Sequence, residues 1–122
     1  MKIKNFTLKE LLHTDCQLPN YPKTFEQIEN LLMLASVLQQ IRDKYDDIIC
    51  INSAFRTFAV NERVGGVHNS YHCQGRAADI RPSYHPVADY QNNLDRLKNV
   101  INENKHLFTE VIIYDTFIHV AI

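Results

Sequence analysis

Residues 69–81 read NSYHCQGRAADIR, and this stretch organises the rest of the chain. A loop with His72 and Gly75 leads directly into AADIR, whose small and apolar residues predict a strand that carries Asp79. Gly75 and the two alanines before Asp79 are small enough to let the loop fold back onto that strand. We therefore expect the side chains of His72 and Asp79 to converge.

Helices are expected on the amino-terminal side of this stretch. Thr7 with Glu10, and Thr24 with Gln27, have the spacing of capping boxes, which predicts a short helix and then a long one. The segment LPNYP, residues 18–22, predicts a loop between them. In the second helix, apolar residues recur at helical intervals over about five turns. These residues are Ile28, Leu31, Leu32, Ala35, Leu38 and Ile41.

Strands and a further long helix make up the remainder. The isoleucine-rich run IICINSA, residues 48–54, predicts a buried strand, and a short helix is expected around residues 57–64. Residues 87–108 carry apolar side chains at helical spacing and predict a second long helix. EVIIYD and FIHVAI, residues 110–115 and 117–122, predict two strands joined as a hairpin. This mixture predicts the α+β class, with a small, mostly antiparallel sheet packed with helices.

The length, charge and cysteine content of the chain limit its domain organisation, its partners and its cellular compartment. A chain of 122 residues has the usual size of one compact domain, so residues 1–122 are expected to form a single unit. The 13 basic and 14 acidic residues are mixed along the chain, which disfavours nucleic acid as a partner. The sequence has neither an apolar run of bilayer length nor a signal-peptide pattern, and we expect a monomer that does not insert into membranes. Three widely spaced cysteines, Cys16, Cys50 and Cys73, indicate reduced thiols, or at most one bridge, and a reducing compartment.

His119 is the third candidate ligand for a metal site. A catalytic zinc site commonly uses three protein ligands from His, Asp, Glu or Cys and keeps a fourth position for water. His119 stands between two apolar residues on the last expected strand, so alternation points its imidazole away from the apolar side. A single strand histidine is also common as a hydrogen-bonded structural residue, so spacing alone leaves both interpretations open. The pair His68 and His72 has the zincin spacing, but Asn69 stands where the general-base glutamate is needed, which rejects that site.

Several segments resemble one known family. SYHCQGRAAD, residues 70–79, resembles the S-x-H-x-x-G-x-A-x-D signature of the zinc D-alanyl-D-alanine carboxypeptidase family, which is related to the hedgehog amino-terminal domain. INSAFRTFAVNERVGG, residues 51–66, is similar to the family's S-G-[YF]-R-S segment with its following Asn and Gly-Gly. FIHVAI resembles the closing W-x-H-[VI] strand, with Phe117 in place of the tryptophan. NFTLKELLHTD, residues 5–15, is similar to the amino-terminal segment of short phage and bacterial members.

The resemblance implies a Zn²⁺ cofactor and a set of site residues. Carried over position by position, it implies that His72, Asp79 and His119 bind the metal. Arg56 would hold the carboxylate or carbonyl oxygen of the substrate, for which a fixed guanidinium fork is suited, and a surface salt bridge is the alternative. Ser70, two residues before the first ligand, would hydrogen-bond the substrate or shape the loop as a turn residue.

The chain departs from the family at the proton carrier. Many members have a glutamate three residues before the last histidine, where this chain has Thr116. We expect Asp115 to serve as the catalytic carboxylate, with Glu110 as the second candidate, although Asp115 is equally typical of a hairpin turn. Tyr114 would stabilise an oxyanion or pack as an ordinary aromatic residue.

These features favour a zinc metallopeptidase that hydrolyses peptidoglycan stem peptides, as a D-Ala-D-Ala carboxypeptidase or a phage-type endopeptidase. The alternative is a non-catalytic zinc-containing binding module on the same fold, which the missing glutamate favours. The expected partner is a peptidoglycan peptide. With no signal peptide, the protein is expected to be cytoplasmic, or prophage-encoded and released through a membrane lesion.

Overall fold

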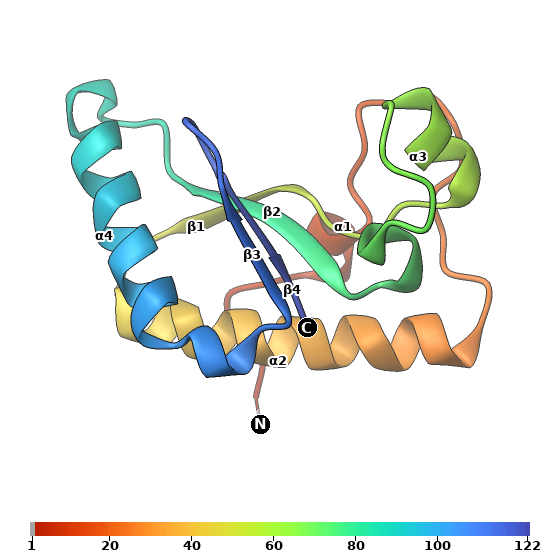
Figure 1. Cartoon of the computed structure of the whole chain (residues 1–122), viewed down its shortest axis with the longest axis horizontal. Helices are drawn as coiled ribbons and strands as arrows, with labels where there is room; N and C mark the ends of the chain where they lie inside the picture. The colour runs from red at the N-terminus through yellow and green to blue at the C-terminus, as the bar shows by residue number, and fades with distance from the viewer. Residues whose placement is uncertain (1) are drawn as a thin grey trace.

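Four short strands form one antiparallel sheet in the order β1–β2–β4–β3, in a computed structural model that describes residues 2–122 (Figure 1). The strands are β1 (Ile49–Ser53), β2 (Ala77–Pro82), β3 (Glu110–Ile113) and β4 (Ile118–Ala121). All three neighbouring pairs are antiparallel, and β3 and β4 form the predicted hairpin. The strand that follows the NSYHCQGR loop therefore lies inside the sheet, between β1 and β4.

Helices lie around this sheet in the described part of the chain. They are α1 (Leu8–Leu11), α2 (Phe25–Tyr45), α3 (Phe58–Arg63) and α4 (Tyr90–Glu103), with short 3-10 turns η1 (Tyr71–Gln74), η2 (Val87–Asp89) and η3 (Lys105–Leu107). Both predicted capping boxes are present, after Thr7 and after Thr24. The predicted α+β class is confirmed. None of the helices in residues 2–122 is both long and apolar enough to cross a membrane.

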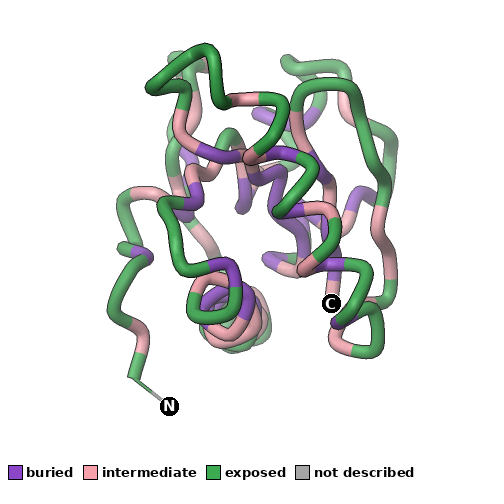
Figure 2. The backbone as a smooth tube through the Cα atoms, turned by 90° about the vertical axis from the view of Figure 1, so that its left-hand side faces the viewer, coloured by how far each residue is buried: buried purple, intermediate pink, exposed green. Residues whose placement is uncertain are grey.

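The hydrophobic core lies between the sheet and the two long helices. Helix α2 runs below the sheet, and α4 stands at one end of it (Figure 1). Strand alternation sends Ile80, Ile118 and Val120 into this core, where each is 0% exposed. Burying one such side chain contributes roughly 1.5–3 kcal/mol. Figure 2 shows the buried positions gathered in the middle of the molecule.

The apolar face of α2 is buried only in part. Four of the six apolar residues at helical spacing are buried: Leu31, Ala35, Leu38 and Ile41. The other two, Ile28 and Leu32, lie at the edge of this apolar face and are 43% and 59% exposed. These two side chains border a surface groove together with Leu8, so the amino-terminal segment is their neighbour instead of the sheet.

Candidate metal centre

Asp79 and His119 lie side by side on the face of the sheet that is opposite the core. They are directly paired in the antiparallel register of β2 and β4. Their neighbours Ile80, Ile118 and Val120 are fully buried in the core, so alternation turns Asp79 and His119 to the other face. The predicted orientation of His119 is confirmed.

His72 reaches the same face from the η1 turn. Ser70 caps this turn, because its Oγ accepts a hydrogen bond of 3.1 Å from the backbone N–H of His72. Gly75 ends the turn with a φ of 75°, a left-handed conformation that glycine adopts without strain. Ser70 is 7% exposed and shapes the loop, and its hydrogen bond to the substrate stays a prediction.

Helix α2 supports the η1 turn from outside the sheet. Gln27 Nε2 donates to the carbonyl oxygen of Cys73 at 3.2 Å, and Asn30 Nδ2 donates to that of Gln74 at 2.9 Å. Gly75 packs so closely on the helix that an added Cβ would lie 2.7 Å from the Gln27 carbonyl oxygen. These contacts hold the turn, and the imidazole it carries, against a long rigid element.

The three predicted ligands converge on one point. Their ligand atoms all lie within 4.8 Å of one another, and the residues are buried. Asp79 Oδ1 is 3.3 Å from His72 Nε2 and 2.9 Å from His119 Nδ1. Two imidazole nitrogens and one carboxylate oxygen are a donor set that catalytic zinc sites use. The residues present therefore fit a Zn²⁺ ion.

Hydrogen bonds outside the cluster orient both imidazoles. His72 Nδ1 lies 2.6 Å from the carbonyl oxygen of Ala54, so Nδ1 carries a proton and Nε2 faces the cluster. His119 Nε2 lies 2.7 Å from Glu110 Oε1, and in this ring Nδ1 faces the cluster. Each ring thus presents one nitrogen to the metal position and donates from the other, as metal-binding histidines commonly do.

The cluster also keeps Asp79 ionised. Burial by itself raises the pKa of Asp79, but its hydrogen-bonding contacts with His119 and His72 and the electrostatic attraction to them hold that pKa well below its usual range. Burial by itself lowers the pKa of His119, but its hydrogen bonds with Asp79 and Glu110 and their negative charge raise that pKa above its usual value. Asp79 is therefore a carboxylate, the form that binds a metal.

Arg56 lies beside the cluster with its guanidinium fixed by three acceptors. Its Nε donates to Ser53 Oγ at 3.0 Å, its Nη1 to Asn61 Oδ1 at 3.1 Å and its Nη2 to Asp79 Oδ2 at 3.3 Å. The contact with Asp79 is an ion pair, and the Arg56 side chain is 14% exposed, so this ion pair lies within the site and not on the open surface. The structure thus brings Arg56 to the predicted ligands.

The comparison with known families agrees with this geometry. The profile of the Peptidase M15 family matches residues 4–121. The chain belongs to the Peptidase M15 family. Its members are zinc-dependent peptidases of the D-alanyl-D-alanine carboxypeptidase type, so the predicted resemblance is confirmed. A search of curated protein sequences found no significant match.

The carboxylate beside the cluster of this M15 chain is Glu110, and the structure does not bring Asp115 there. Glu110 begins β3 and contacts His119 through Oε1. The backbone N–H of Tyr114 donates to the backbone carbonyl oxygen of Phe117 at 3.0 Å, and the rings of Tyr114 and Phe117 stack with centroids 4.6 Å apart. This closes a tight turn with Asp115 exposed at its tip. Tyr114 therefore packs against Phe117, as one of its two predicted roles requires.

The cluster lies in a cleft of about 740 Å³. The loop after α3 contributes residues 64–67 to the lining, and the β3–β4 hairpin contributes Ile112, Tyr114 and Phe117. Arg56 and Glu110 line the same cleft together with the three candidate ligands. A peptide in this cleft would meet apolar and aromatic side chains along its length and charged groups at the metal centre.

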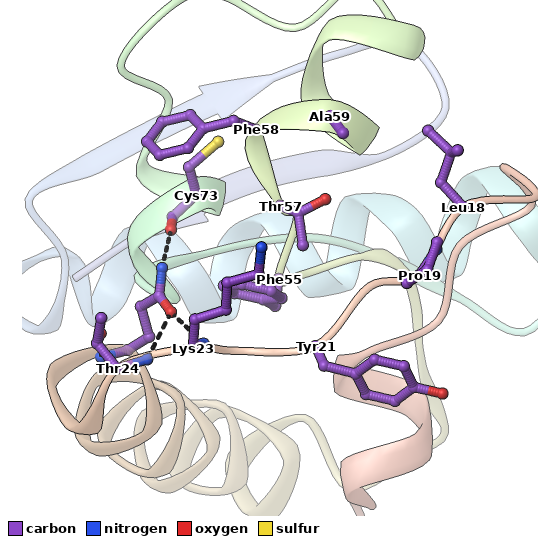
Figure 3. Close-up of a pocket in the computed structure, with 11 residues that line it drawn as sticks. Leu18, Pro19, Tyr21, Lys23, Thr24, Phe55, Thr57, Phe58, Ala59 and Cys73 are labelled. Carbon is purple, nitrogen blue, oxygen red and sulfur yellow. Dashed lines mark hydrogen bonds between the residues drawn. The ribbon is translucent and has the colours of Figure 1, made fainter.

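A second pocket, of about 640 Å³, lies apart from the metal ligands, and Figure 3 shows the side chains arranged around it. Its lining is mostly apolar and includes Leu18, Pro19 and Phe58. Cys73 also lines it, and burial raises the pKa of this thiol while Arg56 opposes the shift. A protonated thiol is a poor metal ligand and a poor nucleophile, so this pocket gains no catalytic group from Cys73.

Two residues at the site were not singled out by sequence reasoning. Ser53 and Asn61 both accept hydrogen bonds from Arg56. Both belong to the segment INSAFRTFAVNERVGG, which resembles the family over its whole length. The sequence therefore indicated that this segment matters but gave no role to either residue.

Proposed function

We propose that this protein is a zinc-dependent peptidase that hydrolyses peptide bonds in peptidoglycan stem peptides. The observation that carries the proposal is the convergence of His72, Asp79 and His119 in a cleft that Arg56 and Glu110 also line. Membership of the Peptidase M15 family supports the same reaction class. The substrate class rests on the family, since the cleft itself identifies no particular amino acid.

His72, Asp79 and His119 would hold the metal through Nε2, Oδ1 and Nδ1, the atoms that face one another in the cluster. When bound there, Zn²⁺ supplies a Lewis acid that polarises the scissile carbonyl and lowers the pKa of water from 15.7 towards ~7. Ala54 and Glu110 keep the two imidazoles oriented by accepting their outer N–H groups.

Glu110 is the group proposed to move the proton. Its Oε1 is engaged by His119, and its second oxygen takes a proton from the attacking water. The water oxygen bonds to the carbonyl carbon, the C–N bond breaks, and Glu110 delivers the proton to the leaving amine nitrogen. Water is thereby divided between the new carboxylate and the new amine, and no other reactant is needed.

Arg56 is proposed to hold the oxygen of the substrate carbonyl. An arginine has five N–H donors, and three of them are engaged by Ser53, Asn61 and Asp79. One N–H on each Nη atom is left for an oxygen that becomes negative as the bond breaks. A planar fork held in place stabilises that charge better than a mobile point charge does.

A non-catalytic zinc-binding module is the second candidate. Thr116 stands where many family members have the glutamate, and this departure is the observation that favours it. The contact between Glu110 and His119 weighs against it, because a carboxylate is present at the cluster after all.

One assay separates the two candidates. Zinc-loaded protein is incubated with purified muropeptides, and the products are read by mass spectrometry. A peptidase releases fragments whose masses differ from the substrate by one bond cleavage and one added water, and those masses also identify the cut bond as terminal or internal. A protein that binds one Zn²⁺ per chain but leaves every muropeptide intact contradicts the proposed function and supports the binding module.

A further inference from the structure

Asn61 is a buried side chain with both ends of its carboxamide engaged. It lies in α3 and is 5% exposed. Its Oδ1 accepts from Arg56 Nη1 at 3.1 Å, and its Nδ2 donates to the carbonyl oxygen of Val67 at 2.9 Å. One amide group therefore connects the arginine beside the metal cluster to the loop that lines the cleft.

Gly66 packs directly on this connection. Its backbone N–H donates to the carbonyl oxygen of Asn61 at 2.8 Å. A Cβ added at Gly66 would lie 2.0 Å from Asn61 Oδ1 and 2.9 Å from Arg56 Nη1, closer than real Cβ atoms come. A glycine is needed here because two polar side chains occupy the space beside its backbone. The cleft loop and the Asn61–Arg56 contact thus form one packed unit.

Asn61 also decides how Arg56 is oriented. A guanidinium is planar, so acceptors at Nε, Nη1 and Nη2 together fix both its position and the direction of its remaining N–H groups. Ser53 and Asp79 contact Nε and Nη2, and Asn61 supplies the acceptor at Nη1. Without Asn61 Oδ1, the group is free to tilt about the line between its other two contacts.

The orientation of Arg56 reaches the metal ligands through Asp79. Asp79 Oδ2 accepts from Arg56, while Asp79 Oδ1 faces both His72 and His119. The two oxygens of one carboxylate are rigidly linked, so a tilt of the guanidinium changes the plane in which Oδ1 is presented. Groups that hold a ligand in this way commonly affect metal affinity and activity by roughly 10–100-fold.

We propose that Asn61 is a positioning residue of the active site, which fixes Arg56 and, through it, the Asp79 carboxylate. It acts without contacting the substrate, and its effect on turnover rests on the proposed peptidase function. The bond from its Nδ2 to Val67 makes the same residue an anchor of the cleft loop.

The test compares two substitutions at Asn61 with one at Asn104. Asn61→Leu keeps the approximate volume and removes both hydrogen bonds, whereas Asn61→Asp keeps an oxygen acceptor for Arg56 and loses the donor to Val67. Asn104 is also 5% exposed and uses its amide to contact Lys44 and the Val100 carbonyl oxygen. It lies at the end of α4, so Asn104→Leu is a matched loss of a buried amide outside the cleft.

Three measurements are made on each variant. They are the guanidinium N–H signals of Arg56 by ¹⁵N NMR, the Zn²⁺ affinity by chelator competition, and kcat and KM on a muropeptide. For Asn61→Leu we expect loss of the resolved Arg56 Nη signals, roughly 10-fold weaker zinc binding and a roughly 10-fold lower kcat at similar KM. Asn61→Asp should keep the Arg56 signals, because a carboxylate oxygen still accepts from Nη1, and its kcat should fall less than that of Asn61→Leu. Asn104→Leu should lower the melting temperature and leave all three readouts unchanged.

The inference is overturned if Asn61→Leu leaves the Arg56 signals and zinc affinity unchanged, or if Asn104→Leu reduces them equally. If Asn61→Leu does not fold, Asn61→Asp decides, and loss of the Arg56 signals in that variant also overturns the inference. If the parent protein cleaves no muropeptide, the proposed function fails, while the NMR and zinc readouts still decide whether Asn61 positions Arg56.

Discussion

Replacement of Glu110 by glutamine tests the proposed chemistry most directly. Glutamine has the same shape and keeps a carbonyl oxygen that can accept from His119 Nε2, the contact that Glu110 makes at 2.7 Å. It does not accept a proton at neutral pH. The substitution therefore removes proton transfer and preserves the orientation of His119. General acid–base assistance is worth about 10²–10⁴-fold in rate, which corresponds to roughly 2.7–5.4 kcal/mol of transition-state stabilisation.

The expected cost to folding and metal binding is much smaller. The Glu110 side chain is 40% exposed, so the loss of its charge is screened by solvent and costs about 1 kcal/mol or less of unfolding free energy. Glu110→Gln should thus bind one Zn²⁺ per chain and unfold near the parent temperature while its kcat falls at least ~100-fold. Single-turnover cleavage of a purified muropeptide, with zinc content measured on the same sample, separates these effects.

Asp115→Asn is the matched control, because Asp115 is an acid of the same hairpin that lies exposed at the turn. Its turnover should stay within about 3-fold of the parent, as is usual for surface substitutions away from a site. Parent-like turnover in Glu110→Gln would refute the assignment of the proton carrier. A ~100-fold loss in Asp115→Asn would return that role to Asp115 and require the turn to move during catalysis.

Three further predictions follow from the geometry of the site. The parent protein should bind one Zn²⁺ per chain and lose activity when a chelator removes the metal. Elemental analysis should find that His119→Ala has lost most of the bound metal, and full zinc binding by this variant would place the metal elsewhere. Arg56→Lys should lower kcat/KM by roughly 10-fold or more with a smaller effect on the melting temperature, because a point charge does not replace a planar fork; an equal or larger loss of stability would make Arg56 a structural residue. Gly75→Ala should lower the melting temperature more than Gly65→Ala does, since both glycines have a φ near 75° but only at Gly75 would the added Cβ contact backbone, 2.7 Å from an α2 carbonyl oxygen. Equal losses of melting temperature in the two variants would mean that backbone conformation alone matters.

Local patterns predicted the positions of the candidate ligands only in part, and the choice of His72, Asp79 and His119 as a set came from the family resemblance. The spacing of Thr24 and Gln27 defines the start of α2, which supports the η1 turn, and alternation defines the side to which His119 points. The capping-box spacing and the strand alternation both depend on residues a few positions apart, so they can be recognised without knowing the tertiary structure. The pairing of Asp79 with His119 also requires the register of β2 and β4, which neither signal predicts.

The carboxylate was harder to predict, since proximity in a hairpin depends on register. Asp115 is four residues from His119 and Glu110 is nine, yet Glu110 makes the contact. Ile112 pairs with His119, so Glu110 is a diagonal neighbour on the same face of the sheet. The register follows from the number of residues in the turn, and EVIIYDTFIHV permits more than one turn length.

The register also explains why the site combines rigid and adaptable parts. One row across three strands supplies Ser53, Asp79 and His119, and ladder hydrogen bonds hold this row together. The loops add Arg56 and His72, which are joined by a hydrogen bond of 3.1 Å from the Arg56 backbone N–H to the His72 carbonyl oxygen. Displacing a member of the row requires breaking sheet pairing that the core beneath it stabilises. Displacing the Arg56 side chain breaks its hydrogen bonds but no sheet pairing, so substitution of Arg56 should alter turnover more than it lowers stability.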